Sequence, residues 1–319
     1  MKSEERSPLV STKWLDQHQA DPDIRLVDVR WRSRTENGRG VGFDDRDGYK
    51  DGHIPGAVFG AMVDEMSDPN HAIPDMLAGA DQFALVMGRL GIGNDTLVIT
   101  YDDTGFPFGA ARLWWALSYY GHDRVKVLDG GLRQWKREGR RLSTDVPVIT
   151  PTEFMPRPRP DWIAGKHDVM AALKRPETLI IDCLTPEQYQ GSGDRHPWGQ
   201  RKGHIPGAVN VPYLAVVDPE LASAPPAERS QLLAGDRSFA FSTPEKLAAV
   251  FATAGVSEDR EVITYCGRGY AGAVGLLALK VLGHQRVRLF DGSWSEWSAD
   301  PDLPVAVGAA PFPARPSRE

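Results

Sequence analysis

The chain has 319 residues, enough for about two domains of the usual ~100–200 residues each. Hydrophobic residues make up 41% of it, which provides for a packed core and argues against wholesale disorder. With 37 Lys and Arg against 43 Asp and Glu, the formal net charge is −6 and no basic block resembles a nucleic-acid footprint, so DNA or RNA binding is not expected.

The N-terminal sequence and the cysteine count bear on the compartment. MKSEERSPLVSTKWLDQH (1–18) is charged and lacks the apolar core of a signal peptide, and no stretch approaches the roughly 18 apolar residues of a membrane span. Cys183 and Cys266 can form at most one disulfide, which fits a reduced compartment. We therefore expect a cytoplasmic protein without membrane contact.

In the first half of the chain, short apolar runs alternate with a helical stretch. RLVDV (25–29), TLVITY (96–101) and VKVLDG (125–130) are rich in Val, Ile and Leu and are flanked by Gly, Asp or Pro, which predicts buried strands. AARLWWALSYYG (110–121) predicts a helix whose last residue is a glycine suited to a C-cap.

Next comes VPVITPTEFMPRPRPDW (146–162), which is rich in proline and poor in periodicity and predicts an extended linker. Beyond it, LIIDC (179–183), EVITYC (261–266) and VRLFDG (287–292) predict strands, and AGAVGLLALKVLG (271–283) predicts a helix. The second half therefore repeats the order of the first.

The repetition extends to individual motifs. GHIPGA occurs at 52–57 and 203–208, VITY at 98–101 and 262–265, and an apolar run ending in Asp-Gly closes each half. Strands that alternate with helices indicate a parallel sheet covered on both faces. We predict an α/β fold of tandem duplicated domains, 1–145 and 163–319, joined by a linker over 146–162.

The most informative motif is the loop CGRGYA (266–271), which follows the predicted strand EVITY. Ligands of parallel sheets bind beyond the carboxyl ends of the strands, where this loop lies. Gly267 and Gly269 permit positive φ or close approach, and successive N–H groups near a helix N-terminus form an anion cradle. Such surroundings lower a thiol pKa, so we expect Cys266 to be largely a nucleophilic thiolate at neutral pH.

Two other positions provide internal comparisons. Cys183 lies inside an apolar strand with no glycine loop after it, so we expect a small buried hydrophobe there. Alignment of Tyr101 with Tyr265 places Asp102 opposite Cys266. The first copy thus lacks the thiol, and its domain is expected to be structural and inactive, whereas 163–319 is expected to be catalytic.

Together, the doubled GHIPGA boxes, the paired VITY strands, the single cysteine loop and the ending DGSWSEW (291–297) resemble the two-domain rhodanese superfamily of sulfurtransferases. The resemblance spans nearly the whole chain and implies tandem rhodanese-like domains with sulfane-sulfur transfer through a Cys266 persulfide. It implies a small anionic sulfur donor, and cyanide or a thiol, with a thioredoxin-like protein among the candidates, as acceptor. It implies neither a metal nor an organic cofactor.

The resemblance also bears on the donor. Thiosulfate sulfurtransferases carry a basic pair after the cysteine, whereas 3-mercaptopyruvate sulfurtransferases carry CGSGVT-like loops; CGRGYA has the glycine of the second and the cation of the first. Arg268 can neutralise the sulfite that leaves thiosulfate, and Arg195 is the candidate to hold a donor carboxylate. We favour thiosulfate and keep 3-mercaptopyruvate as the alternative.

Further assignments follow from the same resemblance. The 3-mercaptopyruvate branch uses a loop serine, a histidine and an aspartate for proton transfer; these correspond to Arg268, His53 and Asp44, so the triad is incomplete. The recurrence of His53 as His204 favours a structural role for both. Tyr270 and Ala271 complete the loop, and Tyr270 either covers the persulfide or packs at the helix start.

Two other classes of protein use a similar cysteine loop. Cysteine-dependent phosphatases need C-x₅-R, but the sixth residue after Cys266 is Gly272, so the phosphate clamp is missing. A non-enzymatic persulfide carrier or redox sensor remains an alternative, because Cys266 could hold a persulfide or a sulfenate without turnover.

Overall fold

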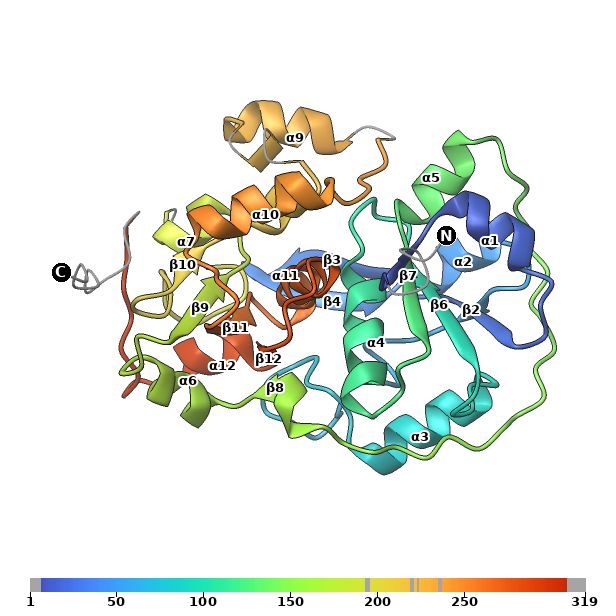
Figure 1. The fold of residues 1–319 in the computed structure, drawn as a ribbon, viewed down its shortest axis with the longest axis horizontal. Helices are drawn as coiled ribbons and strands as arrows, with labels where there is room; N and C mark the ends of the chain where they lie inside the picture. Colours follow the sequence, from blue (N-terminus) through green and yellow to red (C-terminus); the bar gives the residue numbers. More distant parts are fainter. Residues whose placement is uncertain (1–6, 193–195, 219–220, 223, 235–236, 309–319) are drawn as a thin grey trace. The chain divides into compact units, whose positions relative to one another are not determined.

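The computed structural model describes residues 7–192, 196–218, 221–222, 224–234 and 237–308. Its helices and strands are shown in Figure 1. In the first half they are β1 (Leu9–Val10), α1 (Thr12–His18), β2 (Ile24–Asp28), β3 (Trp31–Glu36), β4 (Arg39–Asp44), α2 (Arg46–Asp51), β5 (Val58–Phe59), α3 (Ala80–Arg89), β6 (Leu97–Tyr101), α4 (Phe108–Tyr119), β7 (Val125–Leu128) and α5 (Gly131–Arg137). In the second half they are η1 (Pro160–Trp162), β8 (Ile163–Ala164), α6 (Lys166–Ala172), β9 (Thr178–Asp182), α7 (Pro186–Gln190), β10 (Val209–Asn210), η2 (Tyr213–Val216), α9 (Pro226–Ala234), α10 (Pro244–Thr253), β11 (Glu261–Tyr265), α11 (Tyr270–Val281), β12 (Val287–Phe290) and α12 (Ser293–Ala299).

Each half builds a five-stranded parallel sheet with the same topology. The strand order is β1-β7-β6-β2-β5 in the first and β8-β12-β11-β9-β10 in the second. Both sheets contain the predicted strands. Gly121 follows α4 with φ 85, and Gly283 follows α11 with φ 82. The predicted α/β fold and its duplication are therefore confirmed.

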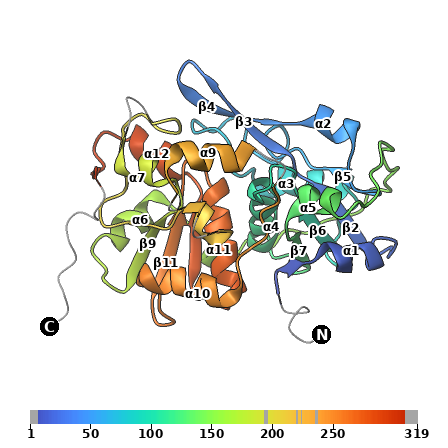
Figure 2. The same ribbon diagram turned by 90° about the horizontal axis from the view of Figure 1, so that it is seen from above.

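In the second sheet, successive side chains of a strand point to opposite faces. Ile263 and Tyr265 of β11 pack in one hydrophobic cluster with residues of α6 and α12. Thr264 points to the other face, where its methyl group lies close to Gly275 of α11. Figure 2 shows α11 beside β11 in a second view. The sheet is thus covered on both faces, and its carboxyl edge carries the loop after β11.

The chain divides into two compact units whose membership does not follow the duplication strictly. The first unit comprises residues 1–33, 42–159 and 226–241, and the second comprises 34–41, 160–225 and 242–319. In the first unit, the N–H of Phe241 donates to Asp129 Oδ1 at 2.8 Å. In the second, the N–H of Gly40 donates to the carbonyl of Pro197 at 2.7 Å. A segment of each copy therefore belongs to the other copy's unit.

The proline-rich segment 146–162 has no regular structure up to its final 3₁₀ turn. Within the first unit its backbone is nonetheless anchored, because Thr152 N–H donates to Gly88 and Arg157 N–H to Tyr120 at 3.0 and 2.8 Å. Hydrogen bonds to a residue of α3 and to the C-cap of α4 in the first unit therefore hold part of this segment, whose role as a linker stays a prediction. Among the described residues, no helix combines the length and apolar character needed to cross a membrane.

Candidate active site

Cys266 follows β11 directly, and α11 begins four residues later at Tyr270. The strand EVITY is buried on both faces, so its end brings the cysteine into the interior, where only 3% of its surface is exposed. The loop therefore delivers one sulfur atom to a nearly water-free position at the carboxyl edge of the sheet.

Backbone N–H groups converge on this sulfur. The N–H groups of Gly272 and Arg268 donate toward Cys266 Sγ, and that of Gly269 contributes less. We use the name anion cradle for the N–H groups of Arg268 and Gly272, because the N–H of Gly269 also lies 3.1 Å from Ser293 Oγ. Such donors suit a thiolate or persulfide anion.

The predicted lowering of the thiol pKa is wrong in direction. Burial raises the pKa of Cys266, the cradle offsets only part of this effect, and the nearby carboxylate of Asp182 raises the pKa further. The physical reason is desolvation, which disfavours the charged form of any acid. The cradle therefore stabilises an anion that burial otherwise opposes.

The two loop glycines are required for different reasons. Gly269 adopts φ 80, a left-handed conformation that side chains rarely adopt. Gly267 does not adopt a left-handed φ. A Cβ atom on Gly267 would, however, overlap the side chain of Trp198 and lie 2.6 Å from the Cβ of Trp198. The sequence predicted that the two glycines provide positive φ or close approach, but it did not indicate which glycine provides which.

Trp198 also orients Arg268, the cation of the loop. The guanidinium carbon lies 5.4 Å from the centre of the indole ring, in a cation–π contact. The carbonyl of Trp198 accepts a hydrogen bond from Ser295 Oγ. Gly40 lies so close to the six-membered ring of the indole that a Cβ atom on Gly40 would overlap it. Trp198 is a site residue that sequence reasoning missed.

Comparison with known proteins identifies the architecture. The Rhodanese-like domain family matches residues 11–138 and again 166–300. The chain belongs to the rhodanese family.

Similar rhodanese-family proteins cover almost the whole chain. The 3-mercaptopyruvate sulfurtransferase of Escherichia coli (strain K12) is 36% identical over 296 residues, covering 93% of this chain and 96% of that protein. The putative thiosulfate sulfurtransferase SseB of Mycobacterium tuberculosis (strain CDC 1551 / Oshkosh) is 35% identical over 302 residues, covering 92% and 94%. The crystal structure of SseA from Escherichia coli matches with a TM-score of 0.75 at 33% identity, covering 91% of this chain and 99% of that one. The protein is a sulfurtransferase of this family.

The two histidines of the GHIPGA boxes have equivalent Nδ1 contacts and ring stacking in the two halves, although, among the described residues, Nε2 has a hydrogen-bond partner only in His53. His53 Nδ1 lies 2.8 Å from the carbonyl of Tyr49, on whose ring it stacks, and its Nε2 lies 3.1 Å from the carbonyl of Asp145. His204 Nδ1 lies 2.7 Å from the carbonyl of Tyr189 and stacks on that ring in the same way. These contacts support the structural role that the repeat suggested.

Asp44 binds a loop of its own unit. Its carboxylate accepts the N–H groups of Val63 and Asp64 at 2.8 to 3.1 Å, and burial raises its pKa to about 6. The hydrogen-bond partners of Asp44 and His53 are therefore different backbone groups. Arg195, the candidate for a donor carboxylate, lies outside the described residues.

Several residues at the start of α11, in α12 and before the second GHIPGA box have mainly structural contacts. Tyr270 and Ala271 begin α11 and are buried, at 3% and 6% exposure. Trp294 and Trp297 are fully buried in the core. Arg201 donates to several carbonyls at the end of α12, including that of Leu303 at 2.8 Å, where a cation complements the helix C-terminus.

Cys183 is fully buried after β9, and burial raises its pKa well above the ordinary value. Its Sγ occupies the space beside Gly275, as expected of a small buried hydrophobe. Opposite Cys266, the first copy carries Asp102, which is 3% exposed and whose pKa burial raises well above the ordinary value. Within the described ranges, no group of three or more His, Cys, Asp or Glu side chains could hold a metal ion.

Proposed function

We propose that Cys266 carries the transferred sulfur as a persulfide and that thiosulfate supplies it. The thiolate attacks the outer sulfur of thiosulfate, the S–S bond of the donor breaks, and sulfite leaves with the bonding electrons. Cyanide or a thiolate then attacks the outer sulfur of Cys266–S–S⁻ and restores the thiolate. Each step conserves charge and needs no external oxidant or reductant.

The convergence of N–H groups on the sulfur carries this proposal. Both the thiolate and the persulfide are anions in a buried position, where fixed dipoles act more strongly than in water. Arg268 adds a full positive charge to the same loop, and its contact with Trp198 keeps the guanidinium in one place. A dianionic donor is thereby brought to an anionic nucleophile with its charge partly neutralised.

The chemistry of the two donors distinguishes their requirements. Thiosulfate transfers its outer sulfur without moving a proton, whereas 3-mercaptopyruvate must pass its thiol proton to the methylene carbon as pyruvate forms. Arg268 stands where the mercaptopyruvate branch has its loop serine, and a guanidinium cannot act as that proton relay at neutral pH. We therefore favour thiosulfate.

The alternative donor is 3-mercaptopyruvate. The relative in Escherichia coli that bears this name covers 93% of the chain at 36% identity, which supports the alternative directly. A carrier that holds a persulfide without turnover is the more remote possibility.

A paired donor assay tests the proposal. Thiocyanate formation from thiosulfate or 3-mercaptopyruvate with cyanide is measured for wild type, Cys266→Ser, Cys183→Ala and Arg268→Ser. We expect Cys266→Ser to abolish turnover with both donors, Cys183→Ala to retain it, and Arg268→Ser to lower kcat/KM for thiosulfate at least tenfold more than for 3-mercaptopyruvate. The opposite selectivity of Arg268→Ser would assign 3-mercaptopyruvate as the donor, and stoichiometric sulfur loading without turnover would assign a carrier.

Several further parts of the proposal concern the setting of the reaction. We assign catalysis to 163–319 and a structural role to 1–145, because the thiol is present only in the second copy. A thiol, including that of a thioredoxin-like protein, is the proposed acceptor, and the two free cysteines fit a reducing cytoplasm.

A further inference from the structure

Ser293, the first residue of α12, has an unusual backbone. It is fully buried and adopts φ 51, in the left-handed region. This conformation is strained for a residue with a Cβ, whereas glycine adopts it freely. Among the described residues, the other non-glycine positions with positive φ are Asn37 and Asp75, types that tolerate it better. A serine held here requires a compensating contact.

The hydroxyl of Ser293 provides that contact to the cysteine loop. Its Oγ accepts the N–H of Cys266 at 3.2 Å and the N–H of Gly269 at 3.1 Å. The same hydroxyl donates to the carbonyl of Phe290 at 2.9 Å. One side chain thus ties the first and fourth residues of the loop to the end of β12.

The first copy shows that the turn itself does not need a serine. Gly131 occupies the corresponding position after the Asp-Gly pair and adopts φ 53. The next backbone hydrogen bond is also the same: Leu132 N–H donates to the Asp102 carbonyl at 2.9 Å, as Trp294 N–H donates to the Cys266 carbonyl at 2.9 Å. The preceding residue differs, with φ 76 at Gly130 and φ −61 at Gly292. A glycine nonetheless adopts the same positive φ at this position without strain, and the strained serine occurs in the copy that carries the thiol.

We propose that Ser293 is a positioning residue for the reaction of Cys266: by holding the N–H groups of Cys266 and Gly269, it fixes the loop so that Arg268 and Gly272 direct theirs at the sulfur. The inference rests on the proposed role of Cys266 as the sulfur carrier. A loop anchored at both ends need not reorganise when charge forms on the sulfur, which is how preorganised donors stabilise an anion. Loss of the hydroxyl leaves two buried N–H groups without their acceptor, and the loop must shift to satisfy them.

Two variants separate positioning from simple stability. Ser293→Gly removes the hydroxyl and the backbone strain together, whereas Ser293→Ala removes the hydroxyl and keeps the strain. We expect both to lower kcat at least tenfold, while only Ser293→Ala lowers the thermal midpoint clearly. The matched control is Ser298→Ala on the same helix, which removes a buried hydroxyl that accepts the N–H of Gln200 and should keep kcat within twofold of wild type.

A second readout needs no sulfur donor, so it tests Ser293 even if the proposed function fails. The rate of Cys266 alkylation is followed against pH in a Cys183→Ala background, which leaves Cys266 as the sole thiol. We expect Ser293→Gly and Ser293→Ala to shift the profile to higher pH by the same amount. A wild-type profile and kcat for Ser293→Gly would overturn the inference, as would activity that simply follows the thermal midpoint. Turnover by Cys266→Ser would instead overturn the proposed function.

Discussion

The indole of Trp198 fills the space that a Cβ atom on Gly267 would need. The same ring lies under the guanidinium of Arg268, so one aromatic side chain contacts two consecutive residues of the cysteine loop. Close approach of this kind couples the two positions: a larger residue at 267 displaces Trp198, and a displaced Trp198 no longer supports Arg268. The loop conformation therefore depends on a residue far away in the sequence.

We predict that Gly267→Ala destabilises the protein by about 1–3 kcal/mol, as overpacking does, and reduces sulfur transfer at least tenfold. The free energy of unfolding from denaturant titration and kcat for thiocyanate formation measure the two effects. Because the cause is overlap with one side chain, including its Cβ, Gly267→Ala should be less damaging when combined with Trp198→Gly than its effect on wild type implies.

The control for this cycle is Gly79→Ala. Gly79 precedes α3 with φ −60, and a Cβ there would meet no heavy atom within 4 Å. Since Gly79 is the N-cap of α3 and glycine is favoured over alanine there, a loss of no more than about 1 kcal/mol is expected, without loss of sulfur transfer. Strict additivity of Gly267→Ala and Trp198→Gly would contradict the proposed overlap.

A second prediction concerns the pH dependence of Cys266. Burial raises its pKa, and the Asp182 carboxylate raises it further. We expect the alkylation rate in the Cys183→Ala background to rise with pH through a midpoint above the ordinary cysteine value of about 8.5. Asp182→Asn removes the nearby negative charge, so it should move the midpoint to lower pH and raise the alkylation rate at pH 8.

The surface variant Asp168→Asn serves as control, since its carboxylate pairs with Arg288 and does not contribute to the pKa of Cys266. It should leave the alkylation profile unchanged. An unshifted or upward-shifted midpoint in Asp182→Asn would show that Asp182 does not oppose thiolate formation.

The sequence was sufficient for features that are local or repeated. Runs such as EVITY (261–265) combine strand propensity with burial, and the repeat identifies the same sheet twice. The loop at Cys266 could be located because its glycines follow a strand directly. The β3–β4 hairpin was missed although its signal was present: Asn37 and Gly38 adopt φ 52 and φ 77, the pattern of a type I′ turn.

What the sequence could not supply were properties set by tertiary packing. The direction of the Cys266 pKa shift depends on how much water reaches the sulfur, and composition around the loop does not fix that. The contact of Trp198 with Gly267 joins distant residues without any periodic signal. The association of 226–241 with the first unit likewise follows from contacts such as Phe241 to Asp129, which no local pattern indicates.

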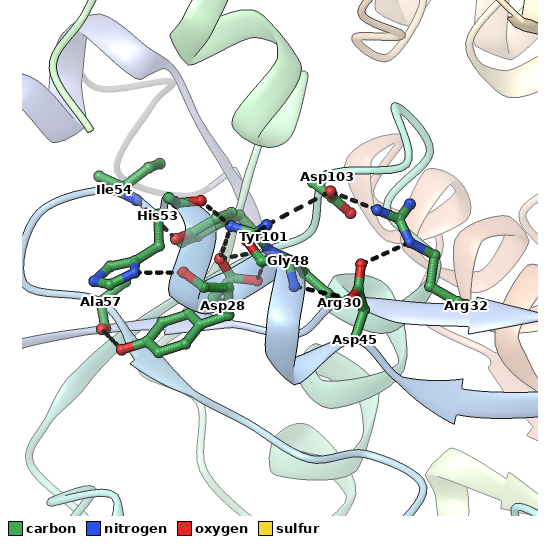
Figure 3. Close-up of polar contacts among 12 residues, drawn as sticks. Asp28, Arg30, Arg32, Asp45, Gly48, His53, Ile54, Ala57, Tyr101 and Asp103 are labelled. Carbon is green, nitrogen blue, oxygen red and sulfur yellow. Dashed lines mark hydrogen bonds and ion pairs between the residues drawn. The ribbon is translucent and has the colours of Figure 1, made fainter. Parts of the chain in front are cut away.

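The two copies differ in how they accommodate a buried aspartate at the end of an equivalent strand. Asp28 pairs with Arg30, whose Nε and Nη2 donate to the carboxylate at 2.9 to 3.0 Å, and Figure 3 shows Arg30 between Asp28 and Asp103. Asp182 has Leu184 at the position of Arg30, so no such cation follows it in sequence. Burial raises the pKa of both carboxyls, to about 6 for Asp28 and about 7 for Asp182.

The third prediction follows from this comparison: Arg30→Leu, which copies the second half, leaves the buried Asp28 carboxylate without its cation. Removal of one partner of a buried pair destabilises by roughly 3–5 kcal/mol. The direction of the pH dependence follows from the raised pKa of Asp28 in the folded protein. The contribution of such a carboxyl to protein stability is fully present below its pKa in the unfolded chain, about 3.9, and is lost as the pH rises through its pKa in the folded protein. The destabilisation by Arg30→Leu should therefore be larger at pH 8 than at pH 5 in denaturant titrations.

Removal of the charge as well as the cation isolates the electrostatic part of this effect. In Asp28→Asn/Arg30→Leu no carboxyl remains to titrate at position 28, so the destabilisation of this double variant relative to wild type should grow less between pH 5 and pH 8 than that of Arg30→Leu. It should not vanish, since Arg30 also donates to the carbonyls of Gly48 and Gly52. Lys50→Ala, which breaks an exposed pair with Asp47, should change stability by less than about 1 kcal/mol at either pH. If the single and double variants showed the same pH dependence, Asp28 would not be the titrating group, and the contrast between the two copies would need another cause.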